Sequence, residues 1–342
     1  MRTVLGLTLF SIFSLVSTTV KSEHATCHQN FTELTKLVEN NYAGYADNIR
    51  QQIEASEIKT LGHIQYESAV DCFATLSNWL AVFADPHLKI TYIDHQQLAK
   101  TISSEPQLRW LSDTVLSLYL GDFSATNRES LASFLQRKMP DLLRAEGVII
   151  DVRGNQGSSF LAMRQILELI GTEGYQSLWH VLASPSNKAF YQRLLEQLDS
   201  SHSLEITAMY SNLVRQMTAY PNTWVEYNWP SVKQDNVLPN IKKIYVLTDK
   251  TVANAAEEFV IAARSNNKVT VIGTNTFGAL DYGQVVAYPI GIDQYQVLIP
   301  SQKRVWYQYG PIDNKGLPPD IVSHLSGDEL LSYTHDLLSQ QL

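Results

Sequence analysis

The sequence predicts an α/β fold that combines a parallel sheet with a helical subdomain at the N-terminal end. Two segments each show a buried apolar strand that runs into a polar turn and then into a helix. Their strands lie at residues 148–152 and 244–247, and a third strand at residues 268–272 completes a β-α-β crossover. Because ligands bind beyond the carboxyl ends of parallel strands, the two turns are candidate functional sites.

The length and composition are those of a globular protein. A chain of 342 residues is long enough for one large domain or two smaller ones, and 44% of its residues are apolar. The formal net charge is −8 and no stripe of basic residues is present, so we expect no nucleic-acid partner. The His residues do not show the spacing of metal ligands, so the sequence predicts no metal site and no cofactor.

Residues 1–22 are predicted to be a secretory signal peptide. Arg2 supplies a positive charge, residues 4–16 are apolar but too few to span a bilayer comfortably, and small residues allow cleavage after Ser22. An uncleaved N-terminal anchor is the alternative. No later segment is apolar enough to cross a membrane. We therefore expect an exported protein, periplasmic or secreted, with no membrane span after cleavage.

The chain has two cysteines, Cys27 and Cys72. Disulfides persist in oxidising compartments, so an even number of cysteines in an exported chain predicts a bond between them. Such a bond would tie the start of the mature chain to the end of a helical region. The alternative is two separate buried thiols.

Residues 23–105 are predicted to form the N-terminal helical subdomain. A helical period is visible in the apolar residues near its start, which are Phe31, Leu34, Leu37 and Val38. Residues 66–84 predict another amphipathic helix, which Pro86 ends, and the alternation of apolar residues after Pro86 predicts a strand. His87 therefore lies at a helix-to-strand junction, where side chains face clefts rather than cores.

Residues 106–328 are assigned to the α/β core and residues 329–342 to a C-terminal helix. The helical pattern itself begins near Gly327. Strands and helices alternate through most of the core. In chain order, strands are expected at residues 114–120, 148–152, 244–247, 268–272, 285–288 and 296–299, and helices at residues 128–145, at residues 160–170 and from Asn254 onward.

Residues 173–235 depart from this alternation. They are rich in Tyr, Trp and Leu and are mostly helical by period. We interpret them as a helical insertion that covers the site as a cap. The alternative is an extra packing layer, and the sequence does not separate the two.

Three segments resemble the S41 serine peptidases, the tail-specific or C-terminal-processing proteases. In chain order they are VIIDVRGNQGSS, TDKTVANAAEEFVIAARSNNKVTVIGTNTFGALDYG and IDNKGLPPDI. Each motif alone is weak, but the ordered set is specific over residues 110–325, and the Asp-Pro-His-Leu segment at His87 extends it toward the N-terminus. The resemblance implies an α/β peptidase core with an N-terminal helical subdomain. The segment between the His87 strand and the core is too short for the PDZ-like domain that many members have.

The position of the family's nucleophile differs in this chain. The family has a Ser three residues before the Glu of the helix, and the matching residue here is Asn254, three residues before Glu257. One branch of the family places a Lys base after Thr-Phe-Gly, where this chain has Ala279. A carboxamide has no ionisable O–H to give to a base, so Asn cannot attack a peptide bond as Ser does. Asn also caps helices well, and with Glu257 it forms a capping-box pattern.

The family's other branch, the tricorn-type peptidases, has further matches in this chain. His87 matches the base of that branch, and Asp313 matches the acid that orients the base. The resemblance implies oxyanion donors at the N–H of Ala255 and in the turn from Gly154 to Gly157. Structural roles are the alternatives: a hydrogen-bonded structural His, a turn-stabilising Asp and a ligand-free β-α connection.

These matches imply an exported S41 family protein, and the activity of that family is serine-type peptide-bond hydrolysis. We expect this activity to be impaired by Asn254, as in a pseudoenzyme, leaving the binding of a peptide or an unstructured protein segment. Two alternatives stay open: an active serine-type peptidase with a non-standard nucleophile, and an interaction protein that uses residues 173–235. The sequence sets neither the substrate nor the oligomeric state.

Overall fold

The computed structural model describes residues 16–48, 50–66, 71–93, 105–172, 174–198, 204–291, 294–306 and 309–342. Most of the predicted signal peptide, residues 1–15, lies outside the described residues, and helix α1 (Val16–Asn41) includes the rest of it. Among the helices in the described ranges, none has the length and apolar character needed to cross a bilayer.

One sheet within the described residues has six strands in the order β11-β8-β7-β4-β3-β2. Neighbouring strands pair in parallel, except that β2 runs antiparallel to β3. The strands are β2 (Gln107–Trp110), β3 (Val115–Tyr119), β4 (Gly147–Asp151), β7 (Lys243–Thr248), β8 (Val269–Gly273) and β11 (Ile321–Val322). The predicted parallel sheet is therefore present, and its central strands β4 and β7 are those that the sequence marks most clearly.

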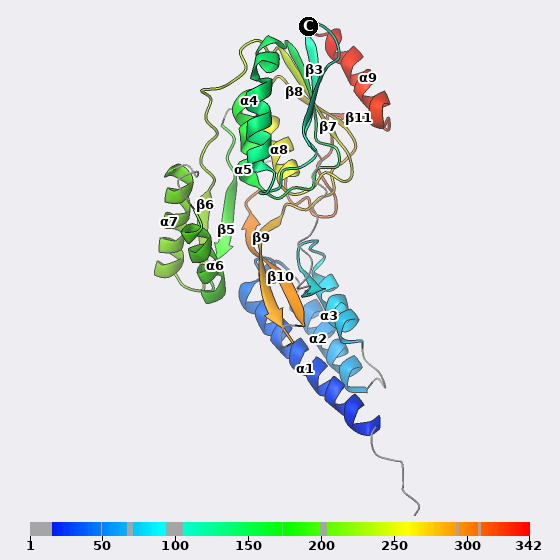
Figure 1. Ribbon diagram of the computed structural model, residues 1–342. Coiled ribbons are helices and arrows are strands. Elements are labelled where there is room, and N and C mark those ends of the chain that lie inside the picture. Colours follow the sequence, from blue (N-terminus) through cyan, green and yellow to red (C-terminus); the bar gives the residue numbers. More distant parts are fainter. Residues whose placement is uncertain are drawn as a thin grey trace, which may run out of the picture.

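Helices cover both faces of this sheet, as Figure 1 shows. Side chains alternate across a strand, so Val148 and Ile150 of β4 join the core beneath one helical layer, while Ile149 packs beneath the other. The first layer consists of α4 (Arg128–Arg144), α5 (Phe160–Ile170) and α8 (Ala255–Ala263), and the second is α9 (Gly327–Ser339). Because both faces are buried, the central strands β3, β4 and β7 are largely apolar.

A second sheet links the N-terminal helices to the core. Its longest strand, β10, pairs with β1, β5 and β9, and β6 adds to β5. The strands are β1 (Lys89–Tyr92), β5 (Leu178–Leu182), β6 (Trp224–Asn228), β9 (Tyr282–Ile290) and β10 (Tyr295–Arg304). The helices packed against one end of it are α1, η1 (Tyr45–Asp47), α2 (Arg50–Tyr66), α3 (Cys72–Leu80) and η2 (Ala81–Phe83) (Figure 1).

The predicted helical insertion also contains two strands. Between β5 and β6 lie α6 (Pro185–Glu196) and α7 (Leu204–Ala219), so residues 173–235 are only partly helical. The helical period missed β6, a short strand in which buried Val225 and Tyr227 alternate with exposed neighbours. Because β5 pairs with β10, and the Tyr227 hydroxyl donates to Gln302 of β10 at 2.5 Å, the insertion is joined to the second sheet. These contacts favour the alternative of a packing layer.

The disulfide joins α1 to α3. The sulfur atoms of Cys27 and Cys72 are 2.25 Å apart, and the Cα atoms are 5.5 Å apart. Near this bond the ring of Phe31 meets the edge of Trp79 at a centroid distance of 5.4 Å, and both side chains are almost fully buried. The bond therefore fastens α1 over the helix that leads to His87.

Candidate functional site

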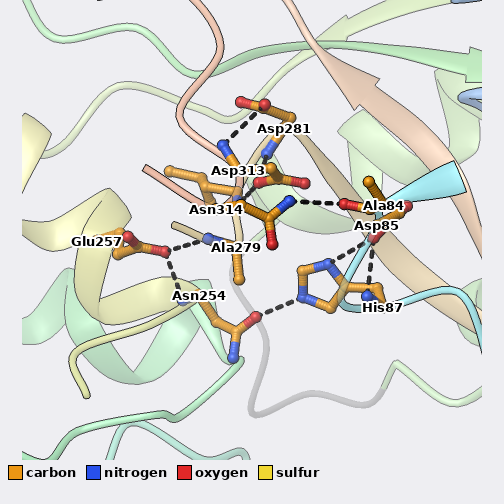
Figure 2. A network of polar contacts seen from close by, with 10 residues as sticks. Ala84, Asp85, His87, Asn254, Glu257, Ala279, Asp281, Asp313 and Asn314 are labelled. Atoms are coloured by element: carbon orange, nitrogen blue, oxygen red, sulfur yellow. Dashed lines mark hydrogen bonds and ion pairs between the residues drawn. The ribbon is translucent and has the colours of Figure 1, made fainter. Parts of the chain in front are cut away.

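Five loops meet at the N-terminal end of α8. They are the turn after β7, the turn after β4, the connection from η2 to β1, and the paired loops before β9 and β11. Figure 2 shows the side chains that these loops bring together, with Asn254 facing His87 and both lying near two aspartates. The sequence placed Asn254, His87 and Asp313 at one site from the family resemblance, and in the structure all three lie in this region.

Asn254 directly precedes α8 and holds an unusual backbone conformation. Its φ is 58° and its ψ is −124°, a region that non-glycine residues rarely adopt. Its side chain extends away from the helix: Oδ1 lies 2.6 Å from Nε2 of His87, and Nδ2 donates to the carbonyl of Gln156 at 3.1 Å. Both the oxygen and the nitrogen of the side-chain amide at the nucleophile position therefore have hydrogen-bond partners.

Glu257 fixes the start of α8 to the following loop, a role that the sequence indicated only in part. The predicted capping-box bond is present, since the Asn254 N–H donates to Oε2 of Glu257 at 3.2 Å. Oε2 also accepts from the N–H of Ala279 at 2.8 Å, while Oε1 accepts from the Thr276 hydroxyl at 2.5 Å and the Gly278 N–H at 2.8 Å. Ala279, at the position of the family's Lys, therefore contributes a backbone N–H that binds Glu257.

His87 is oriented by Asp85, which the sequence analysis did not single out. Oδ1 of Asp85 accepts from the backbone N–H of His87 at 2.8 Å and lies 3.5 Å from Nδ1 of the ring. The Asp85 side chain is fully buried. The Asp-Pro-His spacing, which allows this turn, is the sequence feature that could have identified Asp85. Burial disfavours the charged imidazole, but the nearby carboxylate of Asp85 outweighs it and raises the pKa of His87 above its usual value.

Asp313 does not hydrogen-bond His87 within the described network, so the orienting contact that we predicted for it belongs to Asp85. Oδ1 of Asp313 accepts from the backbone N–H groups of Leu280 at 2.7 Å and Asp281 at 2.9 Å, which turns that oxygen toward the loop. Burial raises the pKa of Asp313 to about 7. The group still lies close by, because potential ligand atoms of Asp85, His87 and Asp313 are all within 4.8 Å of one another.

The proton arrangement at His87 follows from its partner. A carboxamide oxygen only accepts hydrogen bonds, so Nε2 of His87 must carry a hydrogen to make the 2.6 Å contact with Oδ1 of Asn254. The same assignment lets Nδ2 of Asn254 donate to Gln156. In this arrangement Nε2, the nitrogen that faces the nucleophile position, already holds a proton and cannot accept one.

The N–H groups predicted as oxyanion donors have other hydrogen-bond partners in this conformation. The N–H of Ala255 donates to the carbonyl of Gly157 at 3.0 Å, and the N–H of Gly157 donates to Oδ1 of Asn155 at 2.9 Å. The N–H of Gly154 points to Asp249, with a long 3.5 Å contact. Asn155, fully buried, sets this turn, because its side chain binds three backbone groups around it, and the sequence offered no signal for that orientation.

Replacing Gly157 by Ala is expected to lower the free energy of unfolding by about 1–3 kcal/mol. A Cβ at this position would lie 2.2 Å from the carbonyl carbon of Phe123, a backbone atom that cannot move alone. Urea denaturation followed by circular dichroism measures the change. The control is Gly62→Ala in α2, where a Cβ meets nothing within 4 Å and Ala favours the helix. Equal stability of the two variants would contradict the close packing of this turn.

The comparisons agree with the resemblance. A family model described as peptidase family S41 matches residues 114–323. A search of curated proteins found no match. Among solved structures, mature CPAF complexed with lactacystin aligns over 93% of this chain and 99% of its own, with a TM-score of 0.65 and 12% identity.

Two further structures align over nearly the whole chain. A putative peptidase from Parabacteroides merdae ATCC 43184 covers 91% of this chain and 96% of its own, with a TM-score of 0.60 and 16% identity. A lipoprotein from Streptococcus agalactiae covers 93% and 97%, with a TM-score of 0.58 and 12% identity. At such identities these likenesses establish the fold, and the family model spans most of the chain in addition. The chain therefore belongs to peptidase family S41.

Proposed function

We propose that this S41 family protein binds peptides or unstructured protein segments and is impaired in cleaving them. The observation that supports this most directly is the amide of Asn254 at the nucleophile position, with its oxygen 2.6 Å from Nε2 of His87. A serine hydroxyl there would give its proton to that nitrogen. The carboxamide oxygen instead accepts a hydrogen bond from Nε2–H of His87. The proton transfer from nucleophile to base that begins serine-type catalysis therefore cannot take place.

The surrounding donors support the same proposal. In acyl transfer, backbone N–H groups stabilise the negative oxygen of the tetrahedral intermediate. Here the N–H groups of Ala255 and Gly157 already have partners. In unrelated triad enzymes, loss of the triad costs about 10⁶-fold in rate, and oxyanion donors and binding sustain a residual rate about 10³–10⁴-fold over water. With those donors occupied, the residual rate is expected to be lower still.

Export is part of the proposal. The predicted signal peptide and the bond between Cys27 and Cys72 suit a periplasmic or secreted protein, because disulfides persist in oxidising compartments. The structural likeness to a Streptococcus agalactiae lipoprotein is compatible with this. Expression of the full chain with a C-terminal tag, followed by fractionation and N-terminal sequencing, tests it. Recovery of the uncleaved chain from the cytoplasm would contradict export.

The decisive experiment measures binding and cleavage in the same samples. Mature protein, residues 23–342, is mixed with fluorescent peptides of unstructured sequence and with casein, and anisotropy is followed by mass spectrometry of the peptides. We expect binding with intact peptides for the parent and for Asn254→Ser, because the occupied oxyanion donors also limit the variant. Cleavage by the parent that disappears in His87→Ala would show an active peptidase and overturn the proposal.

A further inference from the structure

Buried polar atoms without hydrogen-bond partners gather beside His87. They include Oδ2 of Asp85 and Oδ2 of Asp313, and Nδ1 of His87 makes only a long 3.5 Å contact with Oδ1 of Asp85. The Asp85 side chain is fully buried. The hydroxyl of Tyr42 is buried beside them, and burial together with the charge of Asp85 raises its pKa. Buried polar atoms are normally paired, so several unpaired ones at one point indicate a missing partner.

The side chains of Asp85, His87 and Asp313 can each offer one ligand atom at a spacing that suits a small ion. Potential ligand atoms of Asp85, His87 and Asp313 all lie within 4.8 Å of one another. Nδ1 of His87 is 3.5 Å from Oδ1 of Asp85. In a tetrahedral zinc site with ligands about 2.0–2.1 Å from the ion, neighbouring ligand atoms are about 3.3 Å apart. Small movements would therefore bring these atoms to ligand distances.

Each of the three side chains is oriented by a bond from its other side. The imidazole uses Nε2–H on Oδ1 of Asn254, which leaves the lone pair of Nδ1 directed at the carboxylates. Oδ1 of Asp85 receives the His87 N–H, and Oδ1 of Asp313 receives two backbone N–H groups. Metal-binding histidines almost always donate their other ring N–H to an acceptor that fixes the ring. Asn254 has that position here.

The charges of Asp85, His87 and Asp313 also favour the binding of a cation. A neutral imidazole and two carboxylates would leave two negative charges in a buried place, which is unfavourable without compensation. Among the described residues, Asp85 and Asp313 have no Lys or Arg partner. Either a proton held among the three groups or a bound metal ion can compensate. The convergence of three side chains with metal-ligand atoms, two of them carboxylates with an unpaired buried oxygen, favours the ion.

We propose that Asp85, His87 and Asp313 bind one divalent transition-metal ion of the zinc type, with Asn254 as the residue that positions the imidazole. Nitrogen with carboxylate oxygen is a ligand set that suits zinc or manganese better than the alkaline-earth ions, which prefer oxygen alone. Metal binding here would use side chains of the same candidate site but would not require a bound peptide, and it differs from the sequence-based expectation of no metal. The expectation considered spacing along the chain, in which Asp313 lies far from Asp85 and His87.

Metal content and calorimetry test the site directly. The mature protein is stripped with a chelator, dialysed and titrated with Zn²⁺, Mn²⁺ or Mg²⁺, and bound metal is counted by mass spectrometry. We expect one Zn²⁺ per chain, weaker Mn²⁺ binding and no Mg²⁺ binding. Zn²⁺ affinity should fall at least 100-fold in His87→Ala and in Asp313→Asn. The matched control is His180→Ala, which removes another imidazole–carboxylate pair, 3.3 Å from Glu226 on the surface, and should change nothing.

The role of Asn254 has its own readout. Asn254→Ala should weaken Zn²⁺ binding by about 10–100-fold, while Asn254→Asp, which keeps an acceptor oxygen, should retain it. Nitrogen-15 NMR of His87 in the parent should show Nε2 protonated and Nδ1 metal-bound. Absence of stoichiometric zinc in the parent, a measurement that needs no variant to fold, would overturn the proposal. So would zinc that survives His87→Ala and is lost in His180→Ala.

Discussion

Replacing Glu257 by Gln is expected to lower the free energy of unfolding by about 3–5 kcal/mol, although the two side chains have nearly the same size. Each carboxylate oxygen of Glu257 accepts two hydrogen bonds: Oε1 from Thr276 and Gly278, and Oε2 from Ala279 and the N–H of Asn254. Whichever way a Gln amide is turned, its NH₂ group faces two donors. Two accepted bonds are then lost in a fully buried place, and the donors stay unpaired.

Chemical denaturation of parent and variant measures this loss. The control is Glu196→Gln, an exposed position at the end of α6, where a change within about 0.5 kcal/mol is expected. Burial raises the pKa of Glu257, so comparison at two pH values also tests whether its ionised form accepts these bonds. A loss below about 1 kcal/mol would mean that the loop from Thr276 to Ala279 is held by other contacts.

Replacing Arg304 by Met is the second change for which we expect a loss of about 3–5 kcal/mol. Arg304 and Glu258 form an ion pair in which each side chain is only 4% exposed. The guanidinium also lies over the rings of Trp179 and Trp306, and Nη2 donates to the hydroxyl of Tyr175 at 3.2 Å. Met preserves much of the packing between the rings but leaves the charge of Glu258 without compensation.

A double-mutant cycle separates the charge from the packing. Glu258→Leu alone should also be costly, because it leaves the Arg304 charge unpaired. The combined variant with Arg304→Met should be clearly more stable than the sum of the two single losses predicts, since replacing both members of a buried pair by apolar groups is often neutral. Additive losses in urea denaturation would show that the two side chains act independently.

Together these two glutamates explain how the first turn of α8 is held. Glu257 binds the loop that leads into β9, and Glu258 binds Arg304 at the end of β10. The unusual backbone of Asn254 is thus kept in place by neighbours on both sides. Conformations of this kind persist only where the surroundings determine them.

The sequence predicted those parts of the fold that rest on local patterns. Strands β4 and β7 are apolar over most of their length because both of their faces are buried, and the turns after them fall where expected. Asn254 and His87 were identified because they stand at matched positions of ordered motifs. In the structure these two side chains meet, although they are far apart in the chain.

Other parts of the site depend on the orientation of a peptide group or a carboxylate. Local sequence patterns do not determine such orientations. Asn155 orients the turn at Gly157 through bonds to segments distant in sequence. Asp313 was matched to the family's acid by position, yet backbone N–H groups of a neighbouring loop hold one of its oxygens. The sequence did not predict the short strand β6, because its alternation of buried and exposed side chains extends over few residues.

The pairing of β1 with β10 has a consequence for how the protein folds. Lys89 lies opposite Leu298, so this ladder closes a loop that contains most of the chain. Closing so long a loop is slow relative to local contacts, because its entropy is lost before the pairing is gained. The parallel strands around α8 and the end of that helix can assemble without it. We therefore expect His87, two residues before Lys89, to reach Asn254 among the last contacts to form, so that the site is completed only when the two distant parts of the chain have met.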